Sequence, residues 1–264
     1  MLKPVAAPLV PRVPQEDIVV GRNPVMEALR AGRVRRVWVS ATADDDKVMQ
    51  NLLIQARAVA VPVDRVPPRA LDERSDGTAH QGVLAFCEMR EAATLQDALD
   101  RARGRGEEPF LILLDHVEDP HNLGAVLRVA DGVGAHAVVV PDRGAVGLTP
   151  SVAKASAGAA EHVLLVTVGN LTDAVIWLKK HDIWVGAAEA EHGRPHYEER
   201  LTGPLAIVMG SEGKGVSRPV LKHADFKLHI PLAGHVNSLN VSVATAIIAY
   251  ERVRQSAQSR QQVK

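Results

Sequence analysis

The feature that most constrains the fold is a regular alternation of strand and helix patterns along the second half of the chain. It begins with the apolar run FLILLDHV at residues 110–117, which is typical of a strand buried on both faces of a sheet. Short apolar runs then alternate with longer segments of helical periodicity as far as residue 255. Such alternation predicts an α/β fold in which helices cover a mostly parallel sheet.

A smaller α/β unit is predicted before this sheet, at residues 17–90. Its strand patterns, such as IVV and RRVWVSA, alternate with helical segments such as DDKVMQNLLIQARAV. Asn23 is predicted to cap the first helix, and Gly32 to end it. A chain of 264 residues is long enough for such a small domain joined to a medium one.

The segments outside these two units are predicted to be less ordered. Residues 1–16 contain four prolines, which deny the backbone regular hydrogen bonding, and predict a flexible tail. Residues 91–108 predict a short helix followed by a glycine-containing linker. The sheet domain is expected to cover residues 109–256, and the polar end at 257–264 is expected to be disordered.

Composition limits the functions that remain. Aromatic residues make up 3% of the chain and the formal net charge is zero, so any nucleic-acid surface must be a local patch. The single cysteine, Cys87, excludes an internal disulfide, and its strand context predicts a buried, unreactive thiol. The histidines lack convincing metal-ligand spacing, so no metal is expected. No apolar run reaches the roughly 18 residues of a membrane span, and the start is not signal-like, so we expect a cytoplasmic protein with no membrane partner.

The first stretch that points to chemistry is LDHVEDPHNLGAVLRVADGVGA, at residues 114–135. It reads as a strand end, a polar loop and a helix start, and open parallel sheets bind ligands outside the carboxyl ends of their strands. Asn122 stands where a helix cap belongs, and Arg128 follows six residues later, within the helix. The alternative is that Asn122 is only a cap and Arg128 only a solvated side chain.

The second stretch is IVMGSEGKGVS, at residues 207–217. Its glycines let the backbone approach a ligand closely, although a plain turn would also use them. The spacing does not fit the phosphate loop of nucleotide hydrolases.

The third stretch is IPLAGHVNSLNVSVATAIIAYE, at residues 230–251, where polar residues open an otherwise apolar helix. Ser238 is predicted to cap this helix, which places Asn240 in its first turn. A cap alone does not explain why Gly234, Asn237 and Asn240 accompany Ser238.

In this order and spacing, the three stretches resemble the three motifs of the SpoU (TrmH-like) methyltransferases of the SPOUT superfamily. The preceding unit, with VVGRNPVMEAL and HQGVLA, resembles the L30e-like substrate-binding domain of one branch of that family. The segment PDRGAVGLTPSVAKASAGAAEHV is similar to the branch that methylates a guanosine 2′-hydroxyl of bacterial 23S rRNA.

This resemblance implies a function and an assembly. The methyl donor would be S-adenosylmethionine (SAM), and the acceptor a ribose 2′-hydroxyl of RNA, which the branch resemblance makes 23S rRNA. The catalytic domain would end in a deep trefoil knot and form a homodimer through the knotted domain. In that family the loop before the last helix wraps the cofactor, which would account for the polar start of this helix.

The resemblance also implies site residues, by motif position. Contacts to SAM would come from Gly210, Ile230, Leu239 and Ser238. The polar residues around the reacting centre would be Asn122, Arg128, Glu212 and Asn240.

Two of these residues need a chemical assignment. A guanidinium remains protonated in proteins, so Arg128 is expected to bind the phosphate beside the target ribose and stabilise the developing alkoxide, not to act as a base. Glu212 is then either the base or the residue that holds Arg128.

The first unit would supply the local basic patch. Its candidates for RNA contact are Arg22, Arg33, Arg35, Arg36 and His80. For Arg35 and Arg36, a solvated entrance to a strand fits equally well.

Several alternatives stay open at this point. The substrate could be tRNA, or the rRNA position whose methylation confers antibiotic resistance, and a non-catalytic RNA-binding protein could share the fold. A base methyltransferase acting through a cysteine adduct is disfavoured, because Cys87 lies outside the predicted catalytic domain. A Rossmann-type enzyme would carry its glycine fingerprint after the first strand of the sheet, whereas the glycine-rich loop here comes late.

Overall fold

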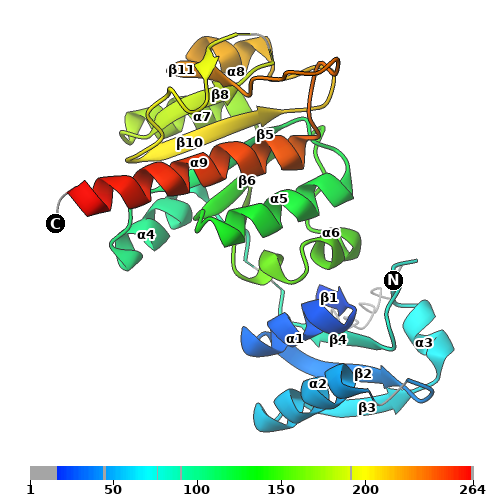
Figure 1. Ribbon diagram of the computed structural model, residues 1–264. Coiled ribbons are helices and arrows are strands. Elements are labelled where there is room, and N and C mark those ends of the chain that lie inside the picture. The colour runs from blue at the N-terminus through cyan, green and yellow to red at the C-terminus, as the bar shows by residue number, and fades with distance from the viewer. Residues whose placement is uncertain (1–16, 44–45, 76, 90, 191, 263–264) are drawn as a thin grey trace, which may run out of the picture.

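The computed structural model describes residues 17–43, 46–75, 77–89, 91–190 and 192–262. Two separate sheets are seen in the ribbon, with the smaller one formed by the N-terminal part of the chain (Figure 1). The predicted tail at residues 1–16 lies outside the described residues.

The larger sheet has seven strands in the order β7-β6-β5-β10-β8-β11-β9, and every pairing between neighbours is parallel. The prediction of an α/β fold with a mostly parallel sheet is therefore confirmed. The strands span Phe110–Asp115 (β5), Ala137–Pro141 (β6), Leu164–Val168 (β7), Trp184–Ala188 (β8), Arg194–Pro195 (β9), Leu205–Gly210 (β10) and Phe226–His229 (β11).

The register of the two central strands decides where the motifs meet. Strand β10 pairs with β5 along its whole length, which places Gly210 beside Asp115 at the carboxyl edge of the sheet. The loops that follow these strands therefore start side by side, although they are far apart in sequence. This edge is where an open parallel sheet is expected to bind a ligand.

Helices cover both faces of this sheet (Figure 1). Apolar side chains of α5 (Pro120–Gly132) and α9 (Val241–Gln262) pack into the core on one face. The other face is covered by α4 (Leu95–Arg105), α7 (Leu171–Lys180) and α8 (Arg218–His223). Helix α4 lies in the segment predicted as a helix plus linker, and its buried face joins the core of the sheet.

Two helix caps predicted in the large-sheet domain were wrong. Helix α5 begins at Pro120, and its N-cap is Asp119, so Asn122 lies within the first turn. Proline is well tolerated in a first turn, which lets the helix start earlier than predicted. The last helix begins at Val241, and the side chain of Asn240, not that of Ser238, accepts a hydrogen bond from its first turn.

The disorder predicted at residues 257–264 was also wrong for the described part of that segment. Helix α9 continues to Gln262. The sequence after residue 251 contains Arg, Gln, Ala and Ser but neither Gly nor Pro, so a helix already formed by packing can propagate through it.

The N-terminal module has a four-stranded sheet in the order β1-β4-β2-β3, with both antiparallel and parallel pairs. Helix α1 begins at Arg22 after Gly21 and has no side-chain cap, so the prediction of Asn23 as a cap was wrong. Cys87 is buried in β4, as predicted. The elements span Asp17–Val20 (β1), Arg22–Arg30 (α1), Val34–Ser40 (β2), Lys47–Ala58 (α2), Val63–Val66 (β3), Pro68–Asp72 (α3) and Val83–Cys87 (β4).

The connection between β6 and β7 contains two short helical pieces. Helix α6 spans Pro150–Ala155, and a single 3-10 turn, η1, spans Ala159–Glu161. Gly158 separates them with a φ of 96°, a conformation that L side chains rarely adopt. The α6 and η1 segment lies between α5 and the N-terminal module (Figure 1).

Buried His136 gives the stability a pH dependence. Its Nδ1 accepts a hydrogen bond from the amide of Phe110, so Nε2 carries the proton and faces Glu107 at 3.1 Å. Burial lowers the pKa of His136, although the hydrogen bond and charge of Glu107 act in the opposite direction. The folded state therefore binds fewer protons here than the unfolded state, whose pKa is about 6.5.

We expect this stabilisation to be present above pH 6.5 or so and to be lost as the pH falls through that value. Urea unfolding at a series of pH values measures it. His136→Gln can still accept from Phe110 and should reduce the pH dependence, while the same change at exposed His235 should not. Equal pH dependence in wild type and His136→Gln would contradict this assignment.

Candidate active site

A cleft of about 600 Å³ lies at the carboxyl edge of the large sheet. Its walls come mainly from the loop after β10 and the loop that leads into α9. Its volume is within the range of small-molecule and cofactor sites. The four residues predicted to contact SAM all line it: Gly210, Ile230, Ser238 and Leu239.

The loop after β10 folds back closely on the end of that strand because Gly210 has no side chain. A Cβ on Gly210 would lie 2.0 Å from the carbonyl carbon of Gly215 and 2.2 Å from the nitrogen of Val216. Ser211 and Gly215 form an isolated bridge that closes this loop on itself. Only glycine permits this backbone packing at position 210, and the loop backbone then lines the cleft.

The donor set of the cleft fits a ligand with both apolar and polar parts. Its lining includes apolar residues such as Met209, Val241 and Ile248 and polar ones such as Glu189 and Lys214. SAM combines an aromatic base, a ribose and charged groups, so this mixed lining is compatible with it. Within the described residues, no group of three or more His, Cys, Asp or Glu side chains could hold a metal ion.

Three of the four predicted polar residues meet beside this cleft. The Nδ2 of Asn240 donates to Oδ1 of Asn122 at 2.9 Å and to Oε1 of Glu212 at 2.8 Å. Its Oδ1 accepts from the amide and hydroxyl of Ser242. The cap on α9 thus fixes which way the amide of Asn240 points, so that its donors face Asn122 and Glu212.

The fourth residue, Arg128, does not join this cluster. Its side chain is exposed, and it makes no hydrogen bond or ion pair with the part of the chain that the structure describes. Six residues along a helix correspond to a rotation of roughly 240° and a rise of about 9 Å, so Arg128 and Asn122 lie on different sides of α5. The alternative that Glu212 holds Arg128 is not seen among the described contacts, since Glu212 is held by Asn240.

Asp115 holds the glycine loop in place, and sequence reasoning missed this residue. It is buried at the end of β5, where Oδ1 lies 2.5 Å from Nδ1 of His116 and Oδ2 accepts from the amide of Ser217 at 2.7 Å. It therefore ties the end of the glycine loop to the neighbouring strand. The signal was available, because an aspartate ends the apolar run FLILLD at the edge where ligands bind.

Four of the five residues predicted to contact RNA fall in two places. Arg22 and His80 line a second cleft of about 390 Å³ in the N-terminal module. Arg22 pairs with Asp46, and His80 with Asp72. Arg35 and Arg36 lie outside that cleft on β2, exposed, and pair with acidic residues of neighbouring strands or strand ends.

These observations define a class of protein. It is an α/β protein with a glycine-lined cleft and an amide and carboxylate cluster at the edge of a parallel sheet, joined to a small α/β module. Residues 109–250 match the model of the SpoU rRNA Methylase family. The chain therefore belongs to this family. Residues 18–93 match a model described as RNA 2′-O ribose methyltransferase substrate binding.

Individual relatives agree with this membership. The chain is 41% identical over 241 residues to YacO of Bacillus subtilis (strain 168), named for the TrmH family of tRNA/rRNA methyltransferases, covering 91% of this chain and 96% of YacO. It is 43% identical over 212 residues to the 23S rRNA (guanosine-2′-O-)-methyltransferase RlmB of Haemophilus influenzae, covering 80% and 86% of the two chains.

A solved structure also agrees with membership of this family. The SpoU methyltransferase AviRb of Streptomyces viridochromogenes, in complex with AdoMet, superposes with a TM-score of 0.77 at 26% identity. The match covers 92% of this chain and 91% of AviRb. Within the described part of the chain, no helix has the length and apolar character needed to cross a membrane.

Proposed function

We propose that this protein is a cytoplasmic SAM-dependent RNA 2′-O-methyltransferase whose substrate is a guanosine of 23S rRNA. The observation that carries the proposal is the meeting of Asn122, Glu212 and Asn240 beside the glycine-lined cleft. The names of the RlmB relatives support the acceptor, and the AdoMet complex of AviRb supports the donor.

Different residues of the chain would bind the cofactor, orient the acceptor and accept the proton during methyl transfer. Bound SAM supplies a methyl group that is already activated by its sulfonium. Gly210, Ile230, Ser238 and Leu239 would hold it in the cleft. The chain then has to orient the ribose hydroxyl, exclude water and manage one proton.

Glu212 is the base that this geometry favours. Its carboxylate is oriented by the amide of Asn240, which is in turn fixed by the cap on α9. It can accept the proton of the ribose 2′-hydroxyl as that oxygen attacks. Asn122 accepts a hydrogen bond from the same side-chain amide of Asn240 and would help to position the ribose.

Arg128 is assigned to the phosphate next to the target ribose. Its guanidinium is exposed, and no partner among the described residues competes for it. Its permanent charge and planar donors suit a phosphate and not a proton acceptor.

The finer points of the fold belong to the same proposal. We propose that the C-terminal segments form a trefoil knot, supported by the packing of α9 against α5 and β10. A homodimer through this domain is supported by an exposed apolar stripe on α9. The stripe consists of Val243, Tyr250 and Val253, whose spacing of seven and three residues keeps them on one side of the helix. The N-terminal module is proposed to be L30e-like, in line with its substrate-binding model.

The test of function is incubation with SAM and separately prepared unmodified 23S rRNA and bulk tRNA, followed by nuclease digestion and nucleoside mass spectrometry. We expect 2′-O-methylguanosine in the rRNA alone. Transfer to tRNA only, which the tRNA/rRNA name of YacO makes a specific alternative, would contradict the substrate. SAM binding without transfer to either RNA would favour a non-catalytic RNA-binding protein.

The substitution Arg128→Lys tests the phosphate clamp. Lysine keeps the charge but loses the paired donors, so we expect methyl transfer to fall about tenfold while SAM affinity changes little. Single-turnover methylation and calorimetry measure the two quantities. Arg103→Lys, on the surface of α4 beside Asp100, is the matched control. Near-full activity of Arg128→Lys would rule out the clamp.

A further inference from the structure

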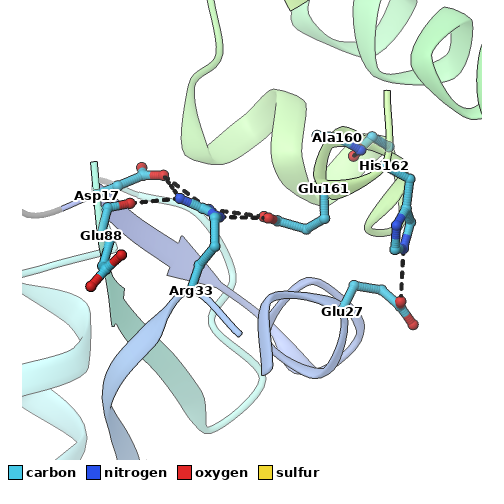
Figure 2. A network of polar contacts seen from close by, with 8 residues as sticks. Asp17, Glu27, Arg33, Glu88, Ala160, Glu161 and His162 are labelled. Carbon is cyan, nitrogen blue, oxygen red and sulfur yellow. Dashed lines mark hydrogen bonds and ion pairs between the residues drawn. The ribbon is translucent and has the colours of Figure 1, made fainter. Parts of the chain in front are cut away.

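One arginine of the N-terminal module binds a carboxylate of the catalytic domain. Arg33 donates from Nε and Nη2 to the two carboxylate oxygens of Glu161, at 2.8 and 3.1 Å. The same guanidinium contacts Asp17 and the carbonyl of Glu88, as Figure 2 shows. The donors of Arg33 thus face groups of the protein itself, although the sequence suggested that this residue would contact RNA.

The pair between Arg33 and Glu161 is shielded from solvent. The side chain of Glu161 is only 3% exposed and that of Arg33 is 18% exposed. Burial alone would lower the pKa of Arg33, but the hydrogen bond to Glu161 and the charges of neighbouring groups, which include Glu161 and Asp17, together raise it. A bidentate pair of this kind has one preferred geometry, and replacing Arg33 takes two donors away from the buried carboxylate of Glu161.

A second contact lies beside the first. The Nε2 of His162 is 3.0 Å from Oε2 of Glu27 on helix α1 (Figure 2). Gly158 permits this approach, because a Cβ at that position would lie 2.3 Å from Cγ of Glu27. Residues 158–162 therefore meet the N-terminal module through an ion pair, a hydrogen bond and close packing.

Helix α6 and η1 are in turn packed against α5, the helix that carries site residues. A Cβ on Gly124 of α5 would lie 2.4 Å from Cβ of Ala155 in α6, so these helices touch at backbone distance. Helix α5 carries Asn122 and Arg128. The contact between Arg33 and Glu161 thus connects the N-terminal module to the element that presents two proposed site residues.

We propose that Arg33 and Glu161 are positioning residues, which hold the N-terminal module in the orientation that delivers bound RNA to the methyl-transfer site. The inference rests on the proposed function for its substrate, but the contact itself does not. Neither residue touches the cleft, so both act through the placement of the module.

The test uses Arg33→Met, Glu161→Gln and the double variant in the full-length chain. Each single substitution should lower kcat/KM for 23S rRNA about tenfold or more, because misplacement of a reacting group by about 1 Å can cost that much or more. SAM affinity by calorimetry should stay as in wild type. The double variant should lose no more than the worse single variant, since both changes break one contact.

A matched control and a second readout separate positioning from general damage. Arg57→Met removes an exposed arginine at the end of α2, in the same module but not at this contact, and should leave kcat/KM unchanged. Hydrogen exchange should rise at β1 and η1 in both single variants and stay unchanged elsewhere in the sheet domain. If Arg33→Met fails to fold, Glu161→Gln carries the test, because it preserves the side-chain shape.

The outcomes distinguish the two proposals. Unchanged rRNA methylation in both single variants, or a parallel loss of SAM affinity, would overturn the positioning role. Additive losses in the double variant would do the same. If the wild type methylates no RNA at all, the proposed function fails. In that case, unchanged hydrogen exchange at β1 and η1 in the variants would by itself show that the Arg33–Glu161 contact does not hold the N-terminal module.

Discussion

Replacing Gly210 by alanine should lower SAM affinity about 100-fold, because overpacking of this kind costs about 1–3 kcal/mol. The added methyl would lie about 2 Å from the backbone of Gly215 and Val216, where no side chain can rotate away. The glycine loop would have to move out of the cleft wall that it forms. Calorimetric titration with SAM measures the loss, and methyl transfer should fall with it.

The control for this substitution is Gly104→Ala. Gly104 lies in helix α4, and a Cβ there would meet nothing within 4 Å. Alanine is favoured over glycine inside a helix by about 1 kcal/mol, so this variant should bind SAM normally and be no less stable. Wild-type affinity in Gly210→Ala would show that the loop after β10 is not part of the cofactor site.

Asn240→Ser should abolish most methyl transfer while leaving the fold and SAM affinity intact. Serine can still cap α9, as Asn240 does, but it loses the two hydrogen bonds to Asn122 and Glu212. Hydrogen bonds to a charged group contribute about 1.5–3 kcal/mol, which corresponds to a rate loss on the order of 100-fold. Single-turnover methylation of 23S rRNA measures this rate.

Two comparisons isolate the lost donor. Asn170→Ser replaces the same kind of cap on α7, away from the cleft, and should have no effect on transfer. Asn240→Asp keeps an acceptor for the cap but brings a second carboxylate to Glu212, and should be as inactive as the serine variant. Activity close to wild type in Asn240→Ser would mean that Asn240 serves only as a helix cap.

The polar start of α9 shows how far local reasoning reached. The sequence indicated that a cap alone could not explain Asn240, and that judgement agrees with its contacts to Asn122 and Glu212. The cap itself was placed at Ser238, two residues too early, because serine and asparagine have similar cap preferences. Local propensity could rank the candidates but could not decide between them.

Arg33, unlike Asn240, has a role that no pattern in the sequence indicated. As one of several arginines near the start of a strand, it was grouped with the residues predicted to contact RNA. Its partner Glu161 lies 128 positions away and shows no pattern that marks it in the sequence. Since a charged side chain pairs with whatever the fold brings near it, composition could not separate this arginine from Arg35 or Arg36.

Hydrophobic period and glycine spacing are local properties of the chain, so the α/β class, the parallel sheet and the three motif stretches could be predicted from the sequence. The hydrogen bonds of the Asn240 amide to Asn122 and Glu212, and the binding of Arg33 to Glu161, could not. These contacts join positions 28 to 128 residues apart. Such pairs form where packed strands and helices bring their ends together, which no local pattern encodes.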